Sequence, residues 1–227
     1  MTSMNIHVVV PVKDLQRAKS RLAELLAPDE RRALVLEMLR RVLTVLLGAQ
    51  NERLQSALLV DVAQTVGAAA SLDIAQIWVI SADATVWSLA TALGACPLPD
   101  QASDLNAALD QARAVAYAAG AEALLIIPAD VPLITAADRQ HLVAALHARA
   151  AFVIAPDHTG RGTNALGFQL PSSLAFHFGP DSFAQHINAA QRAGLVPQIY
   201  VAPTLALDID TTADFHQAGF GSTIGTG

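Results

Sequence analysis

The chain of 227 residues has one cysteine, two tryptophans and two tyrosines, and aromatic residues make up only 5% of it. The single cysteine, Cys96, excludes an intrachain disulfide and a zinc site built from cysteines, and is typical of a reducing compartment. No apolar run approaches the roughly 18 residues of a membrane-spanning helix, and the first residues lack the basic segment of a signal peptide. We therefore expect a cytoplasmic protein that has no membrane partner.

Charge is also scarce. Only 15% of the residues are charged, the formal net charge is −6, and the pI is near 5.5. An acidic chain with few aromatic residues is not typical of a nucleic-acid-binding protein, so we expect no nucleic-acid partner. By contrast, 53% of the residues are hydrophobic, which is enough for a large buried core. Length and composition favour one domain over residues 1–218, followed by a glycine-rich tail over residues 219–227.

Short apolar or β-branched runs alternate with longer helical patterns, as is typical of βαβ units. This alternation predicts an α/β fold with a mostly parallel central sheet flanked by helices. The predicted strands are Ile6–Val10, Ile77–Ile80, Leu124–Pro128, Phe152–Ala155, Leu166–Leu170 and Gln198–Val201. The predicted helices are Pro28–Leu46, Ala84–Leu93, Leu105–Ala119, Ala136–Ala148 and Ser182–Ala193.

The only two lysines of the chain, Lys13 and Lys19, lie close together just after the first predicted strand. With Arg17 and Arg21 they make up four of the fourteen basic residues. Open α/β sheets bind ligands at the loops that leave the carboxyl ends of parallel strands, and lysine is a compact charge that suits phosphate oxygens. The segment therefore predicts an anion site. The alternative is a solvated amphipathic loop without a ligand.

Carboxylates that could hold a metal follow two other apolar runs. Asp130 comes just after a predicted strand, between prolines that discourage both further strand and immediate helix. Asp208 and Asp210 are two residues apart, so in an extended chain both carboxylates point to one side. A magnesium ion would relieve their repulsion, because it binds carboxylate and phosphate oxygens. The alternative, stronger for Asp210 than for Asp208, is capping of the helix that starts near Thr211.

Two glycine-containing segments are candidate anion sites. Gly160, Gly162 and Ala165 nearly match the dinucleotide-binding fingerprint, but that fingerprint opens a helix, whereas a short strand is predicted here. We therefore interpret the turn as a group of backbone N–H donors that can cradle a small anion. Ser182, shortly after Gly179 and near a predicted helix start, offers a second anion site. Its alternative is an ordinary helix cap.

Several catalytic motifs are missing. Neither lysine ends a P-loop, and neither His-Glu-x-x-His nor Gly-x-Ser-x-Gly occurs. The seven histidines are scattered and do not predict a metal site. These absences suit a reaction in which the substrate's own ionised phosphate is the nucleophile, because catalysis then rests on positioning and charge neutralisation rather than on a general base.

Six segments occur in the order found in one enzyme family. They are Pro11-Val-Lys13 with Ala18-Lys19-Ser-Arg21-Leu, Glu30-Arg-Arg, Pro128-Ala-Asp130-Val-Pro-Leu, Gly162-Thr163-Asn164-Ala-Leu, Phe178-Gly179-Pro-Asp-Ser182 and Leu207-Asp208-Ile-Asp210-Thr. Together, from about Ile6 to Asp214, they resemble the guanylyltransferases of coenzyme F420 biosynthesis, called CofC or FbiD. These are the phosphoenolpyruvate or 2-phospho-L-lactate guanylyltransferases.

The resemblance implies a Rossmann-like nucleotide-diphospho-sugar-transferase fold. It also implies that GTP and a phosphorylated three-carbon acid give a guanylylated product and pyrophosphate. It implies that Lys13, Lys19 and Arg21 bind the triphosphate and are catalytic. The residues implied to contact the nucleotide are Pro11, Lys13 and Asn106. Those implied to hold Mg²⁺ are Asp130 and Asp208, with Asp210 as a third candidate. Those implied to contact the acid are Thr163, Gly179 and Ser182.

Two departures from the family pattern stand out. The stretch Gly48–Asp73 is longer than expected, and its apolar content predicts an extended helix or a subunit contact, and hence a possible homo-oligomer. In addition, Asp104 stands before Leu105 and Asn106, where a smaller residue is expected.

The choice of substrate stays open among phosphoenolpyruvate, 2-phospho-L-lactate and 3-phospho-D-glycerate, since each has one phosphate and one carboxylate. An alanine- and arginine-rich composition favours phosphoenolpyruvate, as it is more typical of bacteria than of archaea. Two other functions remain alternatives. One is a nucleotidyltransferase of the same fold that makes a molybdopterin or sugar nucleotide. The other is a catalytically idle nucleotide-binding module.

Overall fold

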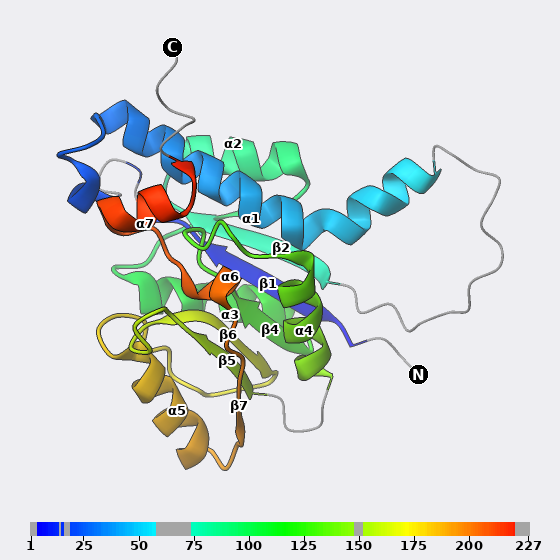
Figure 1. The fold of residues 1–227 in the computed structure, drawn as a ribbon. Coiled ribbons are helices and arrows are strands. Elements are labelled where there is room, and N and C mark those ends of the chain that lie inside the picture. Colours follow the sequence, from blue (N-terminus) through cyan, green and yellow to red (C-terminus); the bar gives the residue numbers. More distant parts are fainter. Residues whose placement is uncertain (1–3, 14, 16–18, 58–73, 148–151, 221–227) are drawn as a thin grey trace.

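The computed structural model describes residues 4–13, 15, 19–57, 74–147 and 152–220 (Figure 1). Their strands form one seven-stranded sheet in the order β3-β2-β1-β4-β6-β5-β7. The strands are β1 Ile6–Pro11, β2 Ile74–Ser81, β3 Cys96–Pro99, β4 Ala123–Ile126, β5 Phe152–Pro156, β6 Thr163–Gln169 and β7 Pro197–Ile199. Only β6 runs antiparallel to its neighbours, β4 and β5. The mostly parallel sheet confirms the predicted fold class.

Helices cover both faces of the sheet (Figure 1). They are α1 Pro28–Ala57, α2 Ala84–Leu93, α3 Leu105–Ala118, α4 Ala136–Leu146, α5 Ser182–Arg192, α6 Pro203–Ala206 and α7 Thr212–Gln217, with a 3-10 turn at Ser20–Leu22. Alternation along β1 explains the two layers. Val8 and Val10 belong to the apolar cluster that contains residues of α1, α2 and α4, whereas Val9 belongs to the cluster of α3 and α5.

Local sequence signals explain where several helices begin. Pro28 starts α1, and Asp29 and Glu30 place negative charge in its first turn, as predicted. In α4, the Thr135 hydroxyl accepts from the backbone N–H of Asp138, whose carboxylate accepts from the N–H of Thr135. This reciprocal capping box satisfies two N–H groups that the helix itself leaves unpaired.

The structure differs from the sequence prediction at several strands, because β2 begins at Ile74, three residues earlier than predicted, and β4 ends at Ile126, two residues earlier. β3 was not predicted, because its two prolines argue against a central strand; β3 lies at the sheet edge, where proline is tolerated. β6 begins at Thr163, three residues earlier than predicted, so the end of the glycine-rich segment is strand. β7 ends at Ile199, two residues earlier than predicted.

The structure describes part of the Gly48–Asp73 stretch and part of the predicted tail. α1 continues to Ala57 and so includes the start of the Gly48–Asp73 stretch, whereas residues 58–73 lie outside the described residues. At the C-terminal end, Phe220 was predicted to belong to the tail, but it is 1% exposed and stacks on Phe215. The packed part of the chain therefore reaches at least residue 220.

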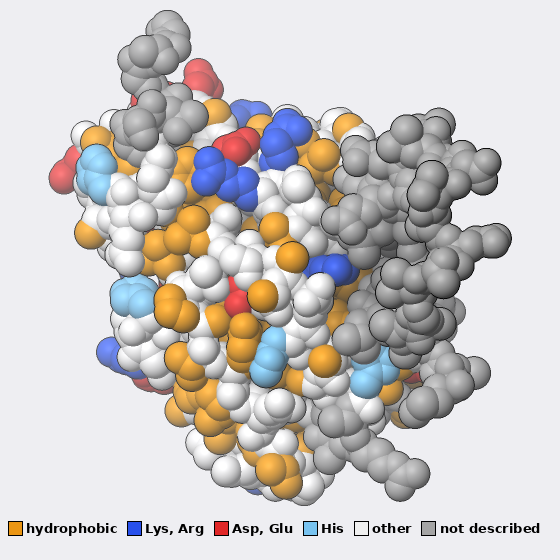
Figure 2. All heavy atoms as spheres, turned by 45° about the vertical axis from the view of Figure 1, so that its right-hand side comes forward, with side chains coloured by type: hydrophobic (Ala, Val, Ile, Leu, Met, Phe, Trp, Pro, Cys, Tyr) orange, Lys and Arg blue, Asp and Glu red, His pale blue; other side chains and the backbone are white. Residues whose placement is uncertain are grey.

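Polar and apolar side chains are mixed on the surface. Figure 2 shows a face on which hydrophobic side chains are interspersed with other residues and basic side chains form only small groups. Scattered apolar residues of this kind are ordinary for a chain with so much hydrophobic sequence. In the part of the chain that the structure describes, no helix combines the length and the apolar character needed to cross a bilayer.

Candidate active site

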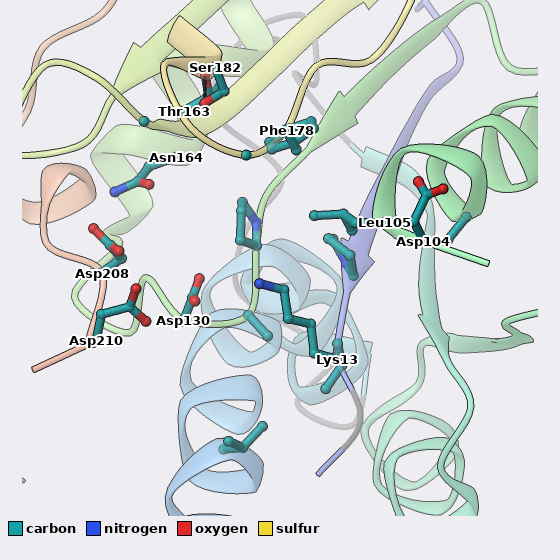
Figure 3. A pocket seen from close by; sticks show the side chains of 18 of the residues that line it. Lys13, Asp104, Leu105, Asp130, Thr163, Asn164, Phe178, Ser182, Asp208 and Asp210 are labelled. Carbon is teal, nitrogen blue, oxygen red and sulfur yellow. Dashed lines mark hydrogen bonds between the residues drawn. The ribbon is translucent and has the colours of Figure 1, made fainter. Parts of the chain in front are cut away.

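A cavity of about 760 Å³ opens at one edge of the sheet (Figure 3). The parallel strands β1, β2 and β4 end there, and the antiparallel strand β6 begins there, so loops from all four strands meet. This is the edge at which open α/β sheets bind ligands. Of the residues that the sequence singled out, the cavity is lined by Pro11, Lys13, Lys19, Arg21, Asp130, Thr163, Gly179, Ser182, Asp208 and Asp210.

Lys19 bridges two of the predicted metal ligands. Its ammonium lies 2.9 Å from Asp130 Oδ2 and 2.9 Å from Asp210 Oδ1, and its side chain is only 8% exposed. Burial alone would lower the pKa of Lys19, but attraction by the two carboxylates and hydrogen bonds to them outweigh burial and raise it. Lys19 is therefore a charged partner of the acidic residues in this structure.

The backbone of Lys19 is unusual for a side chain of this size. It has φ 53° and ψ 40°, in the left-handed region, immediately before the 3-10 turn. A residue with a Cβ adopts this conformation at a cost of about 1–2 kcal/mol. The strained position turns the chain so that Lys19 reaches carboxylates that are 111 and 191 residues away in sequence.

The other two basic residues of the site are more open. Lys13 is exposed, and Figure 3 shows its amine end directed toward Asp130. Burial would raise the pKa of Asp130, but the charge of Lys19, a hydrogen bond from it and the charge of Lys13 hold that pKa below its ordinary value. Arg21 is 75% exposed and lies 3.7 Å from Asp210, a separation and exposure at which an ion pair contributes little stability.

Asp208 is the least satisfied of the three acids. Its Oδ1 atom is buried without a hydrogen-bond partner among the described residues, and the nearest basic nitrogen, His158 Nδ1, is 3.9 Å away. Burial, followed by repulsion from Asp130 and Asp210, raises the pKa of Asp208. A buried oxygen without a partner, beside two other carboxylates, fits a hard divalent cation such as Mg²⁺.

The cation site is not preformed in the described part of the chain. There, no group of three or more acidic, histidine or cysteine side chains has the spacing of a metal site. Instead, the Lys19 ammonium lies between Asp130 and Asp210. The aspartates are thus suitable ligands for a cation, and in this structure the ammonium of Lys19 neutralises part of their negative charge.

Asp210 does not cap a helix, so this alternative was wrong. Thr211 is the N-cap of α7, and it forms a capping box with Asp214. The Asp210 carboxylate instead accepts from Lys19, and the backbone N–H of Asp210 donates to Asp214.

Thr163 and Ser182 form a hydroxyl pair on the opposite side of the cavity from Lys13 (Figure 3). Thr163 is 5% and Ser182 2% exposed, and the Ser182 hydroxyl donates to Thr163 Oγ1 at 3.1 Å. Ser182 is the first residue of α5, after the N-cap residue Asp181, so its hydroxyl is not an ordinary cap. Gly179 has φ 137°, a conformation that side-chain-bearing residues rarely adopt, and nothing lies within 4 Å of where its Cβ would be. Its backbone is therefore open to a ligand.

The turn at Gly160 and Gly162 does not cradle an external anion. The carboxylate of Asp157 already accepts hydrogen bonds from the backbone N–H groups of Thr159 and Arg161. The prediction failed because the turn carries its own anion five residues before Gly162. The position of Asp157 also explains why residue 162 is a glycine, because an added Cβ there would lie 2.7 Å from Asp157 Oδ2.

Replacing Gly162 by alanine should therefore destabilise the protein. The new methyl group would push the Asp157 carboxylate off the two N–H groups, at a cost of about 1–2 kcal/mol of unfolding free energy. Chemical denaturation measures this loss. The matched control is Gly48→Ala in α1, where nothing lies within 4 Å of the added Cβ; there alanine should stabilise by about 0.5–1 kcal/mol. Equal stability of the two variants would contradict the role of Asp157.

Asn106 holds a loop and is not among the described residues that line the cavity, so its contact with the nucleotide stays a prediction. Its side-chain amide donates to the carbonyl of Phe178 at 3.1 Å and accepts from the N–H of Phe178 at 2.7 Å. The unexpected acid before it, Asp104, is the N-cap of α3 and accepts from the N–H groups of Asn106 and Ala107. Asn106 thus fixes the residue that precedes Gly179.

The remaining wall of the cavity is apolar. It is formed by residues of α1, β2 and α3, namely Val35, Met38, Ile80, Leu105 and Ala108. The polar residues Asp100, Ser103 and Asp104 border this wall. An apolar surface with polar groups at its rim suits a flat heterocyclic ring. This wall could not be predicted from the sequence, because its residues are ordinary core residues in their own helices and strand.

The site therefore combines three features that face one cavity. Basic side chains can bind phosphates, carboxylates can hold a divalent cation, and a buried hydroxyl pair can bind a second anion. This combination can bring two phosphorylated molecules together and stabilise the charge that moves between them.

Comparison with known proteins shows the family of this chain. The family described as "Guanylyl transferase CofC like" matches residues 6–49 and 40–219. A phosphoenolpyruvate guanylyltransferase from Chloroflexus aggregans is 40% identical over 93% of this chain and 96% of its own, and one from Rubrobacter xylanophilus is 39% identical over 93% and 92%. Among solved structures, a Desulfovibrio desulfuricans protein assigned as a nucleotide-diphospho-sugar transferase aligns with a TM-score of 0.68 and 16% identity, over 98% of this chain and 90% of that one. The chain belongs to the family of CofC-like guanylyl transferases.

Proposed function

We propose that this protein is a cytoplasmic guanylyltransferase of coenzyme F420 biosynthesis. It joins the GMP part of GTP to a phosphorylated three-carbon acid, with phosphoenolpyruvate favoured, and releases pyrophosphate. The relatives of nearly full length that are named phosphoenolpyruvate guanylyltransferase support the choice of substrates. The observation that carries the proposal is that Lys13 and three aspartates line the same cavity as the Thr163–Ser182 hydroxyl pair (Figure 3).

The proposed roles follow from the shape of the cavity. The apolar wall receives the guanine ring, and Lys13, Lys19 and Arg21 bind the triphosphate. Asp130 and Asp208, with Asp210, hold Mg²⁺. This ion, when bound, would neutralise phosphate charge and align the reacting groups. Thr163, Gly179 and Ser182 hold the phosphorylated acid.

The proposed reaction is attack by a phosphate oxygen of the acid on the α-phosphorus of GTP. The new bond is a phosphoanhydride P–O bond, and the bond that breaks joins the α-phosphorus to the bridging oxygen of pyrophosphate. No histidine occurs among the described residues that line the cavity. That fits a nucleophile that is already ionised near neutral pH and needs no proton removed.

Turnover of GTP with each acid in parallel tests this function. We expect pyrophosphate release with phosphoenolpyruvate and a product with the mass of the guanylylated acid. The matched reactions contain 2-phospho-L-lactate or 3-phospho-D-glycerate in place of phosphoenolpyruvate, and ATP or CTP in place of GTP.

The same assay, repeated with a sugar phosphate or molybdopterin in place of the acid, separates the alternatives. A product formed only with a sugar phosphate or molybdopterin would favour another nucleotidyltransferase of this fold. GTP binding without turnover of any acid would favour the idle module. The retained arrangement of Lys13, Asp130 and Asp208 at one cavity supports an active enzyme over an idle one.

A further inference from the structure

A buried histidine lies directly behind the hydroxyl pair. His186 is one turn after Ser182 in α5, it is 2% exposed, and it is not among the residues that line the cavity. Its Nδ1 atom lies 3.1 Å from Thr163 Oγ1, and its Nε2 atom lies 2.9 Å from the backbone nitrogen of His177. The ring also packs against Phe178 in a T-shaped arrangement, at a centroid distance of 4.9 Å. Both ring nitrogens are therefore engaged, one toward the site and one away from it.

The backbone of His177 fixes the tautomer of this ring. A backbone N–H can only donate, so Nε2 of His186 must accept and carries no proton. Burial, followed by the charge of His177, lowers the pKa of His186 to about 4, so the ring is neutral near pH 7. The single ring proton is then on Nδ1, and it is donated to Thr163 Oγ1.

This direction decides how many hydroxyl protons remain for a ligand. Thr163 and Ser182 have two hydroxyl protons, and one of them forms the hydrogen bond between the two side chains. Because His186 donates to Thr163, the second proton is free. With the opposite tautomer, Thr163 would donate to His186 and Ser182 to Thr163, so no hydroxyl proton would be left for the cavity.

We propose that His186 is a positioning residue that keeps one hydroxyl proton of the Thr163–Ser182 pair directed at the phosphorylated acid. This inference rests on the proposed function, which places the acid at that pair. A phosphate or carboxylate anion only accepts hydrogen bonds, so a hydroxyl binds it only through a free proton. His186 acts through Thr163 and does not touch the acid.

Three substitutions separate the two hydrogen bonds of the ring. The side-chain amide of His186→Asn can place an N–H near the Nδ1 position and so still donate to Thr163. The longer amide of His186→Gln reaches the Nε2 position, where it can accept from His177 but not donate to Thr163. The side chain of His186→Leu fills similar space and makes neither hydrogen bond.

The substitutions are expected to weaken binding of the phosphorylated acid and to leave binding of GTP unchanged. In His186→Gln and His186→Leu, KM for phosphoenolpyruvate and its Kd from calorimetry should rise about tenfold or more, as for loss of a hydrogen bond to a charged group. In His186→Asn the rise should be about threefold or less. KM for GTP should stay near the wild-type value in all three. Equal rises in both KM values, or a larger rise in the asparagine variant than in the glutamine variant, would overturn the proposal.

A double substitution tests whether His186 acts through Thr163. In the Thr163→Val background no threonine hydroxyl remains to be oriented, so adding His186→Gln should not weaken binding of phosphoenolpyruvate further. A histidine that only supports the fold would weaken binding by the same factor in both backgrounds. Melting temperatures of all variants identify losses that come from stability alone.

The ring itself gives a readout that does not depend on turnover. Nitrogen-15 NMR of the full-length protein should show His186 protonated at Nδ1 and unprotonated at Nε2 between pH 6 and 8. An Nε2-protonated or doubly protonated ring would overturn the proposal whatever the enzyme does. If the wild type binds phosphoenolpyruvate but makes no product with GTP, the proposed function fails, while the calorimetric series still decides the role of His186.

Discussion

Replacing Asp130 by asparagine is expected to reduce pyrophosphate release by about 1000-fold or more while the protein stays folded. Asparagine keeps the size of the side chain but removes the charge that would hold a divalent cation. A loss of about 4 kcal/mol in transition-state stabilisation corresponds to this factor. The fold should survive, because Lys19 keeps Asp210 as a partner and the backbone carbonyl of residue 130 still accepts from Ile209.

Two measurements check this expectation. Turnover with saturating GTP and phosphoenolpyruvate gives the loss of activity, and electron paramagnetic resonance of Mn²⁺ gives the loss of metal binding. The matched control is Asp83→Asn at the N-cap of α2, which does not line the cavity. Asparagine caps helices as well as aspartate does, so that variant should keep wild-type turnover. A folded Asp130→Asn protein with wild-type turnover would remove Asp130 from the reaction.

The sequence was sufficient to predict that Lys13 and Asp130 lie at the same edge of the sheet, where both line one cavity. Alternating apolar runs predicted a mostly parallel sheet, and the loops that follow such strands carry Lys13 and Asp130. The parallel arrangement of β1 and β4 then brings these two loops together. The spacing of Asp208 and Asp210 predicted a pair of metal ligands, but only the resemblance predicted that Asp208 and Thr163 belong to the same site, since no local pattern brings them together.

Contacts between distant segments could not be predicted in this way. Lys19 contacts carboxylates far along the chain, and Asn106 contacts the backbone of a residue 72 positions away. Such pairs depend on how the loops pack, and periodicity in the sequence describes only the local chain. The position of His186 had a signal in the sequence that was not used. His186 follows Ser182 by four residues, a spacing that places both side chains on one face of a helix.

Asp157 shows a second limit of prediction from the sequence, which concerns the partner of the backbone N–H groups in a glycine-rich turn. A cluster of glycines indicates where backbone N–H groups converge, but it does not tell whether the chain or a ligand supplies the acceptor. Here a nearby aspartate supplies it, with one carboxylate bonded to the N–H groups of Thr159 and Arg161. A search for an acidic residue within the turn itself would have separated the two cases.

Replacing Lys19 by methionine is expected to have two opposite effects. Turnover should fall about 100-fold or more, because the triphosphate loses a charge for which the chain has no other lysine than Lys13. Binding of Mn²⁺ without nucleotide should instead become tighter. The ammonium now lies between Asp130 and Asp210 at 2.9 Å from each, so a metal ion must compete with it for the same carboxylate oxygens.

The stability of the Lys19→Met protein should depend on metal more than that of the wild type. Without the ammonium, Asp130 and Asp210 lose their shared partner, so the melting temperature should fall when metal is absent. Added Mn²⁺ should restore it, since a ligand that binds only the folded state stabilises that state. Lys19→Arg, which keeps a positive charge, is the matched control and should show a smaller response to the metal. If Lys19→Met binds Mn²⁺ more weakly than the wild type, Lys19 does not compete with the metal, and its contact with the two aspartates instead supports the metal site.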